Sequence, residues 1–192
     1  MDIFAHGLWG GIVAKAIRRT NLAKKFNISP SPWWTGFWAT FPDLFAFVPL
    51  ALILTLGFIF GEVESFRWII GGLYSMGHSF VTWVVAFLIV WIIYRRPRWE
   101  LLGGFSHVLI DIFTHPADRY PTPFLWPLQE TNFDGTSWAT PEFMIVNYIL
   151  ILSSLYFLRD HKNLNEGFYT LSKPRKILLV ILFLSSLTAF IR

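Results

Sequence analysis

The feature of this sequence that most restricts its fold is a series of long apolar runs that carry no charge. Four runs cover residues 44–60, 68–94, 143–158 and 177–191, and the second contains one histidine, His78. A helix needs about 20 apolar residues to cross the hydrocarbon core of a bilayer, so the second run is long enough and the others are somewhat short. The runs predict helices embedded in a membrane.

The composition agrees with a membrane protein. Of the 192 residues, 54% are hydrophobic and 15% are charged, whereas about a quarter of a typical soluble domain is charged. The absence of cysteine excludes disulfides and thiolate metal ligands. Basic residues lie in connecting segments and form no stripe along a helix, so we expect no nucleic-acid partner.

We expect an all-α, polytopic membrane protein with about five membrane-embedded helices and an N-terminal amphipathic helix over residues 3–19. Lys and Arg concentrate in residues 15–25, 95–100 and 159–176, and the positive-inside rule places these segments in the cytoplasm. This arrangement requires a helix over 99–115 to cross the membrane and puts the C-terminus outside. The N-terminal segment lacks the order of a cleaved signal peptide, so we expect it to be retained.

The helix predicted over 99–115 carries a polar stripe of His107, Asp111 and His115, each four residues apart. On an α-helix these side chains lie within roughly 80° of one another. The two histidines are about 12 Å apart along the axis, too far to bind one ion at about 2 Å, but Asp111 could bridge two ions. Pairs of metal ions act in many hydrolytic enzymes. The alternative is a hydrogen-bonded His107–Asp111 pair that satisfies buried polarity.

Three further ionisable residues, His6, Asp43 and His78, also have apolar or aromatic sequence neighbours. Unpartnered polar groups are costly in such surroundings, so these residues are expected to face one another inside the bundle. Imidazole and carboxylate groups are ligands for zinc and, less specifically, for manganese or iron. The alternatives are a helix N-cap for Asp43, a hydrogen bond at a helix kink for His78, and a cationic C-terminal cap for His115.

Straight helices would disperse these residues, with Asp43 near the surface, His107 about 10 Å deep and His78 about 25 Å deep. Three arrangements could remove the conflict. Residues 33–41 could dip into the bilayer, the glycines at 71, 72 and 77 could break the long helix, or the site could consist of His107, Asp111 and His115 with loop residues.

Five short motifs occur in order: "AHGLWG", "FPDLFAF", "MGHS", "HVLIDIFTH" and "PTPFLWPL". In this order they resemble the YdjM-like family of membrane-bound metal-dependent hydrolases, which is similar in ligand order to zinc-dependent phospholipase C. The resemblance covers residues 1–130. It implies a single domain over 1–192, with the motifs in 1–130 and two C-terminal membrane helices in 143–192, in the cell (inner) membrane.

The resemblance also implies the roles of individual residues. His6 would be an N-terminal metal ligand, Asp43, His78 and His107 would share one ion, and Asp111 would bridge to a second. His115 and the late carboxylate Glu142 are further candidates, although this chain has Trp138 where the phospholipase pattern has a histidine. One to three divalent ions, with zinc the first choice, would activate water for hydrolysis, and Asp43 would act as general base. The substrate would be a phosphoester in a lipid-like molecule.

Two other functions use the same residues. In a transporter or channel-like protein these residues could form an ion or proton pathway. In a membrane scaffold they could be structural, with each side chain hydrogen-bonded to its own neighbours. The sequence leaves the oligomeric state open.

Overall fold

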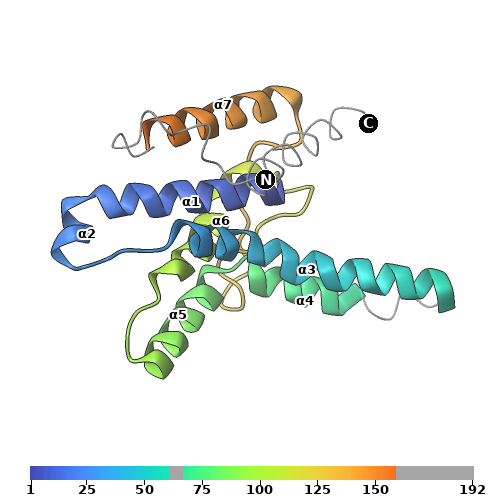
Figure 1. The fold of residues 1–192 in the computed structure, drawn as a ribbon. Coiled ribbons are helices and arrows are strands. Elements are labelled where there is room, and N and C mark those ends of the chain that lie inside the picture. Colours follow the sequence, from blue (N-terminus) through green and yellow to red (C-terminus); the bar gives the residue numbers. More distant parts are fainter. Residues whose placement is uncertain (61–66, 159–192) are drawn as a thin grey trace. The chain divides into compact units, whose positions relative to one another are not determined.

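The computed structural model describes residues 1–60 and 67–158, and the regular elements in these ranges are all helical (Figure 1). In chain order they are α1 (Ile3–Arg19), α2 (Asn21–Lys25), α3 (Pro32–Phe60), α4 (Arg67–Gly77), α5 (Phe80–Tyr94), the 3₁₀ turn η2 (Trp99–Leu101), α6 (Leu102–Thr114) and α7 (Pro141–Phe157). The all-α prediction is confirmed. The predicted helix over 177–191 and the basic segment 159–176 lie outside the described residues.

The chain divides into two compact units, Met1–Trp138 and Ala139–Arg192. Helices α1 to α6 belong to the first unit and α7 to the second. The single domain expected from the family resemblance stays a prediction.

Helix α1 follows the predicted bounds. The carboxylate of Asp2 caps its N-terminus by accepting a hydrogen bond from the Ala5 amide at 2.9 Å. Arg18 and Arg19 occupy the last turn, where cations interact favourably with the helix dipole. These end signals explain why the helix occupies residues 3–19.

Helix α3 begins 12 residues earlier than the apolar run predicted. It has 29 residues, with Pro32 at its start and Pro42 and Pro49 in its interior. Proline suits the first turn of a helix, and inside a helix it removes one backbone donor, which packing in a membrane protein can compensate. Asp43 therefore lies within the helix, and the alternative of a helix N-cap is wrong for this residue.

The long run 68–94 forms two helices, α4 and α5, whose axes differ by 68°. The chain breaks at His78 and Ser79, directly after Gly77, which is one of the three glycines where a bend is predicted. The Ser79 hydroxyl caps α5 by accepting a hydrogen bond from the Val81 amide at 3.1 Å. The indole of Trp83 donates to the carbonyl of Gly77 at 2.8 Å, which ties α5 to the end of α4.

Glycines allow α1, α3 and α6 to pack with their backbones in close approach. A Cβ atom on Gly103 of α6 would lie 2.0 Å from the Thr35 carbonyl oxygen of α3. A Cβ atom on Gly10 of α1 would lie 2.6 Å from the Ala39 Cβ of the same helix α3. Small residues at such contacts are typical of helix packing in membranes. The first half of α3 is therefore enclosed by α1 and α6, while its second half runs beside α4 (Figure 1).

In the described part of the chain, α3 alone is long and apolar enough to cross a membrane, and α4 with α5 makes a second candidate if the bent pair is one span. Helix α6 has 13 residues, about 20 Å, and α7 has 17. The protein is thus helical with one or two membrane-capable spans in this part, and the expected number of five stays a prediction.

Candidate metal centre

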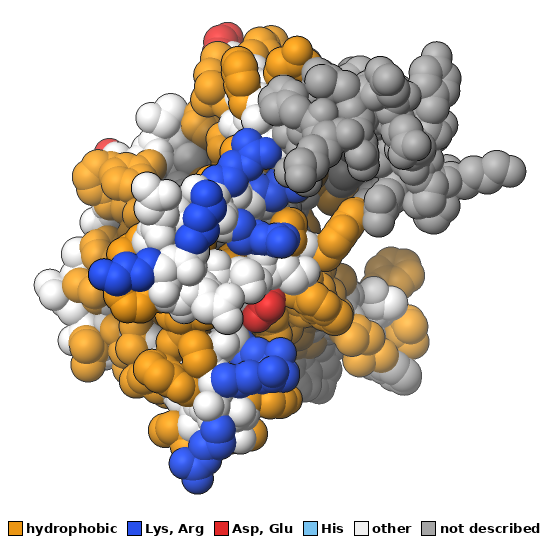
Figure 2. Space-filling view, turned by 60° about the vertical axis from the view of Figure 1, so that its left-hand side comes forward, with side chains coloured by type: hydrophobic (Ala, Val, Ile, Leu, Met, Phe, Trp, Pro, Cys, Tyr) orange, Lys and Arg blue, Asp and Glu red, His pale blue; other side chains and the backbone are white. Residues whose placement is uncertain are grey.

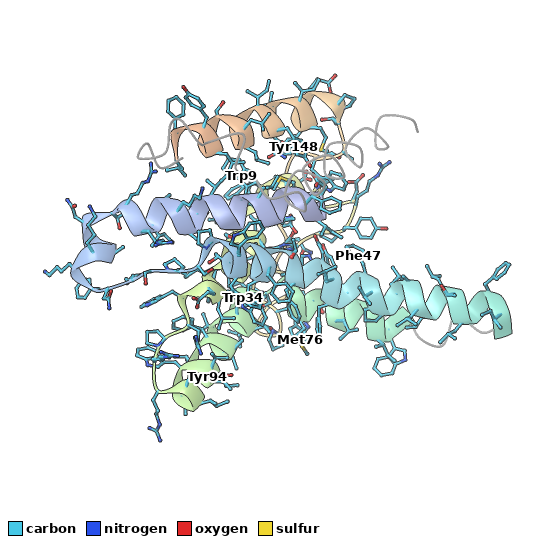
Figure 3. The ribbon with its side chains drawn as sticks, in the orientation of Figure 1. Trp9, Trp34, Phe47, Met76, Tyr94 and Tyr148 are labelled. Carbon is cyan, nitrogen blue, oxygen red and sulfur yellow. The ribbon has the colours of Figure 1, made fainter. Side chains whose placement is uncertain are left out.

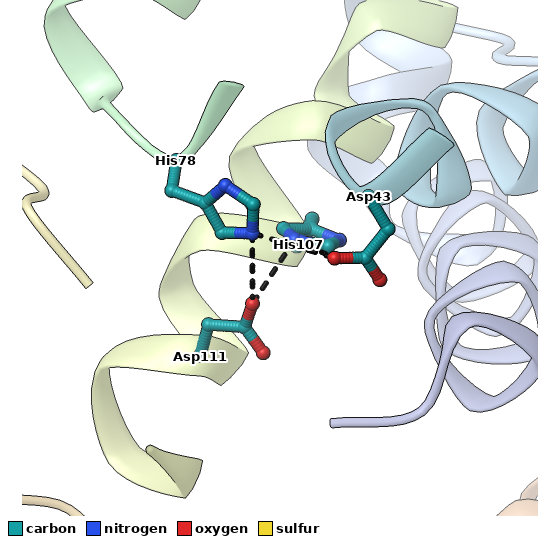
Figure 4. A group of neighbouring side chains, drawn as sticks. All are labelled: Asp43, His78, His107 and Asp111. Atoms are coloured by element: carbon teal, nitrogen blue, oxygen red, sulfur yellow. Dashed lines mark ion pairs between the residues drawn. The ribbon is translucent and has the colours of Figure 1, made fainter. Parts of the chain in front are cut away.

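Four buried side chains from three parts of the first unit meet in its interior (Figure 4). Asp43 comes from α3, His78 from the break between α4 and α5, and His107 and Asp111 from α6. One nitrogen or oxygen atom from each residue lies within 4.8 Å of the corresponding atoms of the other three. Two imidazoles and two carboxylates therefore surround a common point.

Each of the two imidazoles is fixed by a backbone carbonyl. His78 Nδ1 lies 2.9 Å from the Tyr74 carbonyl oxygen, and His107 Nδ1 lies 2.7 Å from the Ala39 carbonyl oxygen. A carbonyl can only accept, so Nδ1 carries the hydrogen in both rings, and Nε2 of a neutral ring has a free lone pair. Metal-binding histidines usually have this arrangement, because the outer hydrogen bond sets the ring orientation.

The two Nε2 atoms face carboxylate oxygens. His78 Nε2 lies 3.4 Å from Asp43 Oδ1 and 3.5 Å from Asp111 Oδ2. His107 Nε2 lies 3.0 Å from Asp111 Oδ2 and 3.8 Å from Asp43 Oδ1. Tetrahedral zinc with ligands at about 2.0–2.1 Å has ligand–ligand separations of about 3.3–3.4 Å. The four nitrogen–oxygen separations, from 3.0 to 3.8 Å, bracket the separation expected between two ligands of one zinc ion.

None of these contacts has the alignment of a hydrogen bond. In the described structure, Nε2 of His78 and His107 and Oδ2 of Asp43 and Asp111 are buried without a hydrogen-bond partner. Two facing acceptors repel each other, and unpaired buried acceptors are costly, unless a cation lies between them. The residues present therefore fit a divalent metal, and the alternative of a simple hydrogen-bonded His107–Asp111 pair fits them less well.

The other oxygen of Asp111 has a second group of neighbours. His6 Nε2 lies 2.9 Å from Asp111 Oδ1, and the Met1 amino group lies 2.8 Å from the same atom. The His6 ring stacks on His107 with 3.8 Å between centroids. Burial lowers the pKa of His6 to about 3 despite the neighbouring Asp111 carboxylate, so the ring is neutral near pH 7. Asp111 thus links the four-residue cluster to His6.

His115 lies at the edge of this second group. It is the C-cap residue of α6, and its Nε2 lies 3.0 Å from the Met1 amino group. Its Nδ1 lies 3.4 Å from the Thr122 hydroxyl and 3.8 Å from Asp111 Oδ2. The Met1 amino group can only donate, so Nε2 of His115 accepts from it, and the ring does not act as the cationic cap that the sequence allowed.

All six predicted ligands thus lie in or beside one buried cluster. The expectation from straight helices, that Asp43, His107 and His78 lie at different depths, does not hold for two reasons. Because α3 extends back to Pro32, Asp43 is about 16 Å from the start of its helix. Because the chain breaks after Gly77, His78 lies at the break. A site made only of His107, Asp111, His115 and loop residues is not what the structure contains. Glu142 lies in the first turn of α7, in the second unit.

Sequence reasoning missed the groups that hold the cluster in place. The Tyr74 ring stacks on His78 with 4.0 Å between centroids, and its hydroxyl donates to the Tyr120 carbonyl at 2.9 Å. Ser79 donates to the Trp126 carbonyl, and the Phe80 amide donates to the Phe124 carbonyl at 2.9 Å, so the loop after α6 is hydrogen-bonded to α4 and to the segment that begins α5. The spacing of four between Tyr74 and His78 is the only one of these signals visible in the sequence.

Fold and site together define an all-helical protein with a buried histidine–aspartate centre. The sequence matches the family of YdjM inner membrane proteins over residues 1–192, so the chain belongs to this family and is an integral protein of the cell membrane. The predicted family is confirmed, whereas similarity to phospholipase C is not shown. Comparison with curated proteins and with solved structures found no match.

Proposed function

We propose that this protein is a membrane-embedded metal-dependent hydrolase that acts on a phosphoester in a lipid-like substrate. The observation that carries the proposal is the pair of buried imidazole Nε2 atoms that face carboxylate oxygens at 3.0–3.8 Å without hydrogen bonds. Asp43, His78, His107 and Asp111 would hold a divalent ion, with zinc the first choice for this ligand set.

Asp111 would bridge to a second ion. Its Oδ2 atom faces His78 and His107, while its Oδ1 atom faces His6 at 2.9 Å and the Met1 amino group at 2.8 Å, which a second ion would have to displace. His115, 3.8 Å from the Asp111 carboxylate, is the remaining candidate on this side. His6, Asp111 and His115 would hold this second ion, which would help to stabilise a leaving oxygen.

Individual residues of the chain would have separate roles in hydrolysis. Bound divalent ions supply Lewis-acid chemistry and favour deprotonation of water near neutral pH. Asp43 Oδ1 faces the imidazoles, whereas Oδ2 is buried without a hydrogen-bond partner, so Oδ2 is the candidate proton acceptor. The backbone carbonyls of Tyr74 and Ala39 keep the two imidazoles oriented, which limits reorganisation during the reaction.

The surroundings of the cluster favour a lipid substrate. The cluster is formed by helices whose outer faces are apolar, for example at Phe58 of α3, 93% exposed, and Ile92 of α5, 67% exposed. A lipid can approach these faces sideways from the bilayer. The ligand side chains themselves are almost fully buried, so a substrate could reach them only by a movement of the surrounding chain.

The test begins with the metal content of the purified full-length chain, measured by elemental analysis. His107→Ala and Asp111→Asn should each remove bound zinc and the zinc-dependent release of phosphate or headgroup from phospholipids in mixed micelles. His161→Ala, in the charged segment "RDHKN", is the matched control and should change neither.

Unchanged metal content and activity in both variants would overturn the proposal. Metal binding without hydrolysis, together with pH-dependent flux into liposomes, would instead favour the ion or proton pathway.

A further inference from the structure

A second feature of the first unit lies apart from the metal cluster. Figure 2 shows Lys and Arg side chains gathered on one face, on the side that holds α2 and the ends of α1 and α5. The basic residues of these segments are Arg18, Arg19, Lys24, Lys25, Arg95, Arg96 and Arg98. Two parts of the chain about 70 residues apart thus contribute to one basic face, as the positive-inside rule predicts for segments on the same side of the membrane.

This face contains a hollow of about 400 Å³. One wall is the connection between α2 and α3, with Asn27 and Ser29, and the other is the segment after α5, with Arg96 and Arg98. Guanidinium, amide and hydroxyl groups are all donors that suit phosphate oxygens. Among the described residues the lining has one carboxylate, Glu100, so these side chains carry a net charge of one positive unit, which matches the single negative charge of a phosphodiester.

The turn after α5 and one side-chain contact restrict the conformation of this wall. Arg95 ends α5 with a left-handed conformation, φ 56°, which turns the chain so that residues 96–98 run along the hollow. The Arg98 guanidinium lies 4.7 Å from the centre of the Tyr94 ring, a cation–π contact that restricts its motion. A positive φ is uncommon and unfavourable for an arginine, so this turn is a specific feature of the segment.

The surroundings of the hollow favour a lipid over a soluble phosphate compound. Tyr94, the last residue of α5, is 55% exposed, and Trp34, in the first turn of α3, is 61% exposed. Figure 3 labels both side chains. Tyr and Trp at the ends of membrane helices mark the headgroup level. Ile92 and Ile93, both 67% exposed, continue this surface along α5 as a path for acyl chains.

We propose that the hollow between Asn27–Ser29 and Arg96–Arg98 binds the phosphodiester headgroup of an anionic phospholipid, with its acyl chains along α5. Basic pockets at the cytoplasmic side of membrane proteins are suited to anionic headgroups. No metal ligand lines the hollow, so this site is independent of the proposed hydrolase reaction.

The experiment titrates the full chain in neutral detergent with phosphatidylglycerol and measures bound lipid by native mass spectrometry. Arg96→Gln should weaken binding about fivefold and the double variant Arg96→Gln/Arg98→Gln about 25-fold. Arg119→Gln removes the same charge from an exposed position outside the hollow and should leave the affinity unchanged. The variant with lysine in place of both arginines should bind more tightly than the double glutamine variant and less tightly than the parent. Lysine supplies the positive charge but not the paired N–H donors of arginine.

Phosphatidylcholine and inorganic phosphate are the comparison ligands. Undiminished binding of phosphatidylglycerol by the double glutamine variant, or equal binding of phosphatidylcholine, would overturn the proposal. Inorganic phosphate that displaces phosphatidylglycerol at equal concentration would overturn the assignment to a lipid. A thermal unfolding curve of each variant establishes that lost binding is not lost folding.

Discussion

At the scale of single residues, the chemistry of the cluster depends on how each imidazole uses its two nitrogens. His78 and His107 direct Nδ1 to a backbone carbonyl and leave Nε2 facing carboxylates. The carbonyl partners are part of the helices, so the orientation of each ring follows from the backbone. This arrangement favours a cation at the common point without requiring the rings to rearrange.

The two carboxylates should contribute unequally to metal binding. Asp111 lies within 4.0 Å of four histidines, and Asp43 within 4.0 Å of two. We therefore expect Asp111→Asn to weaken zinc binding about 100-fold or more, and Asp43→Asn about tenfold. Competition of the purified variants with a zinc-chelating dye measures both affinities. Equal losses would contradict the central position of Asp111.

At the scale of elements, helix packing brings distant ligands together. Helix α3 continues through Pro42, so Asp43 lies in the part of α3 that α1 and α6 enclose. The break after Gly77 gives His78 a position that a straight helix would not give it. Residues contributed by α3, the break and α6 meet because glycines keep these helices close.

Substitution of Gly103 should separate α6 from α3. A Cβ atom there would lie 2.0 Å from the Thr35 carbonyl oxygen, so Gly103→Ala should destabilise the fold by about 1–3 kcal/mol. Gly71, on α4, has no atom of a described residue within 4 Å of an added Cβ atom, and Gly71→Ala should stabilise by up to about 1 kcal/mol. Thermal unfolding in detergent compares the two. A Gly103→Ala protein as stable as the parent would show that the helices are not in such close contact.

The break between α4 and α5 should depend on Ser79. Its hydroxyl caps α5 and also donates to the Trp126 carbonyl, so Ser79→Ala should destabilise by about 1 kcal/mol or more. Because His78 is the preceding residue, zinc affinity should fall as well, by up to about tenfold. The control, Ser153→Ala on an exposed position of α7, should change neither the melting temperature nor the zinc titration.

At the scale of the whole molecule, the proposed metal connects α3, the α4–α5 break and α6. A ligand that binds only the folded state stabilises that state by mass action. At a free zinc concentration 100 times the dissociation constant, this stabilisation is about 2.7 kcal/mol.

A chelator should therefore lower the melting temperature of the parent protein, and added zinc should restore it. The melting temperature of His78→Ala should respond little to either reagent, because one of the four ligands is missing. Differential scanning fluorimetry in detergent measures these shifts. If a chelator leaves the melting temperature of the parent protein unchanged, the metal does not stabilise the fold.

The sequence by itself determined the helical class, the membrane setting and the identity of the polar residues in apolar surroundings. These properties are local. Uncharged runs indicate burial in lipid. The spacing of four between His107 and Asp111 places both residues on one face of a helix, independently of the tertiary structure.

Only the tertiary structure decided that Asp43, His78 and His6 join that face. Their positions depend on contacts between residues far apart in the chain, such as Gly103 against Thr35 and His107 against the Ala39 carbonyl. The sequence contained both prolines and glycines, but whether a helix continues through Pro42 or breaks after Gly77 depends on the packing around each residue. Local pattern therefore supplied the candidate ligands, and helix packing brought them together.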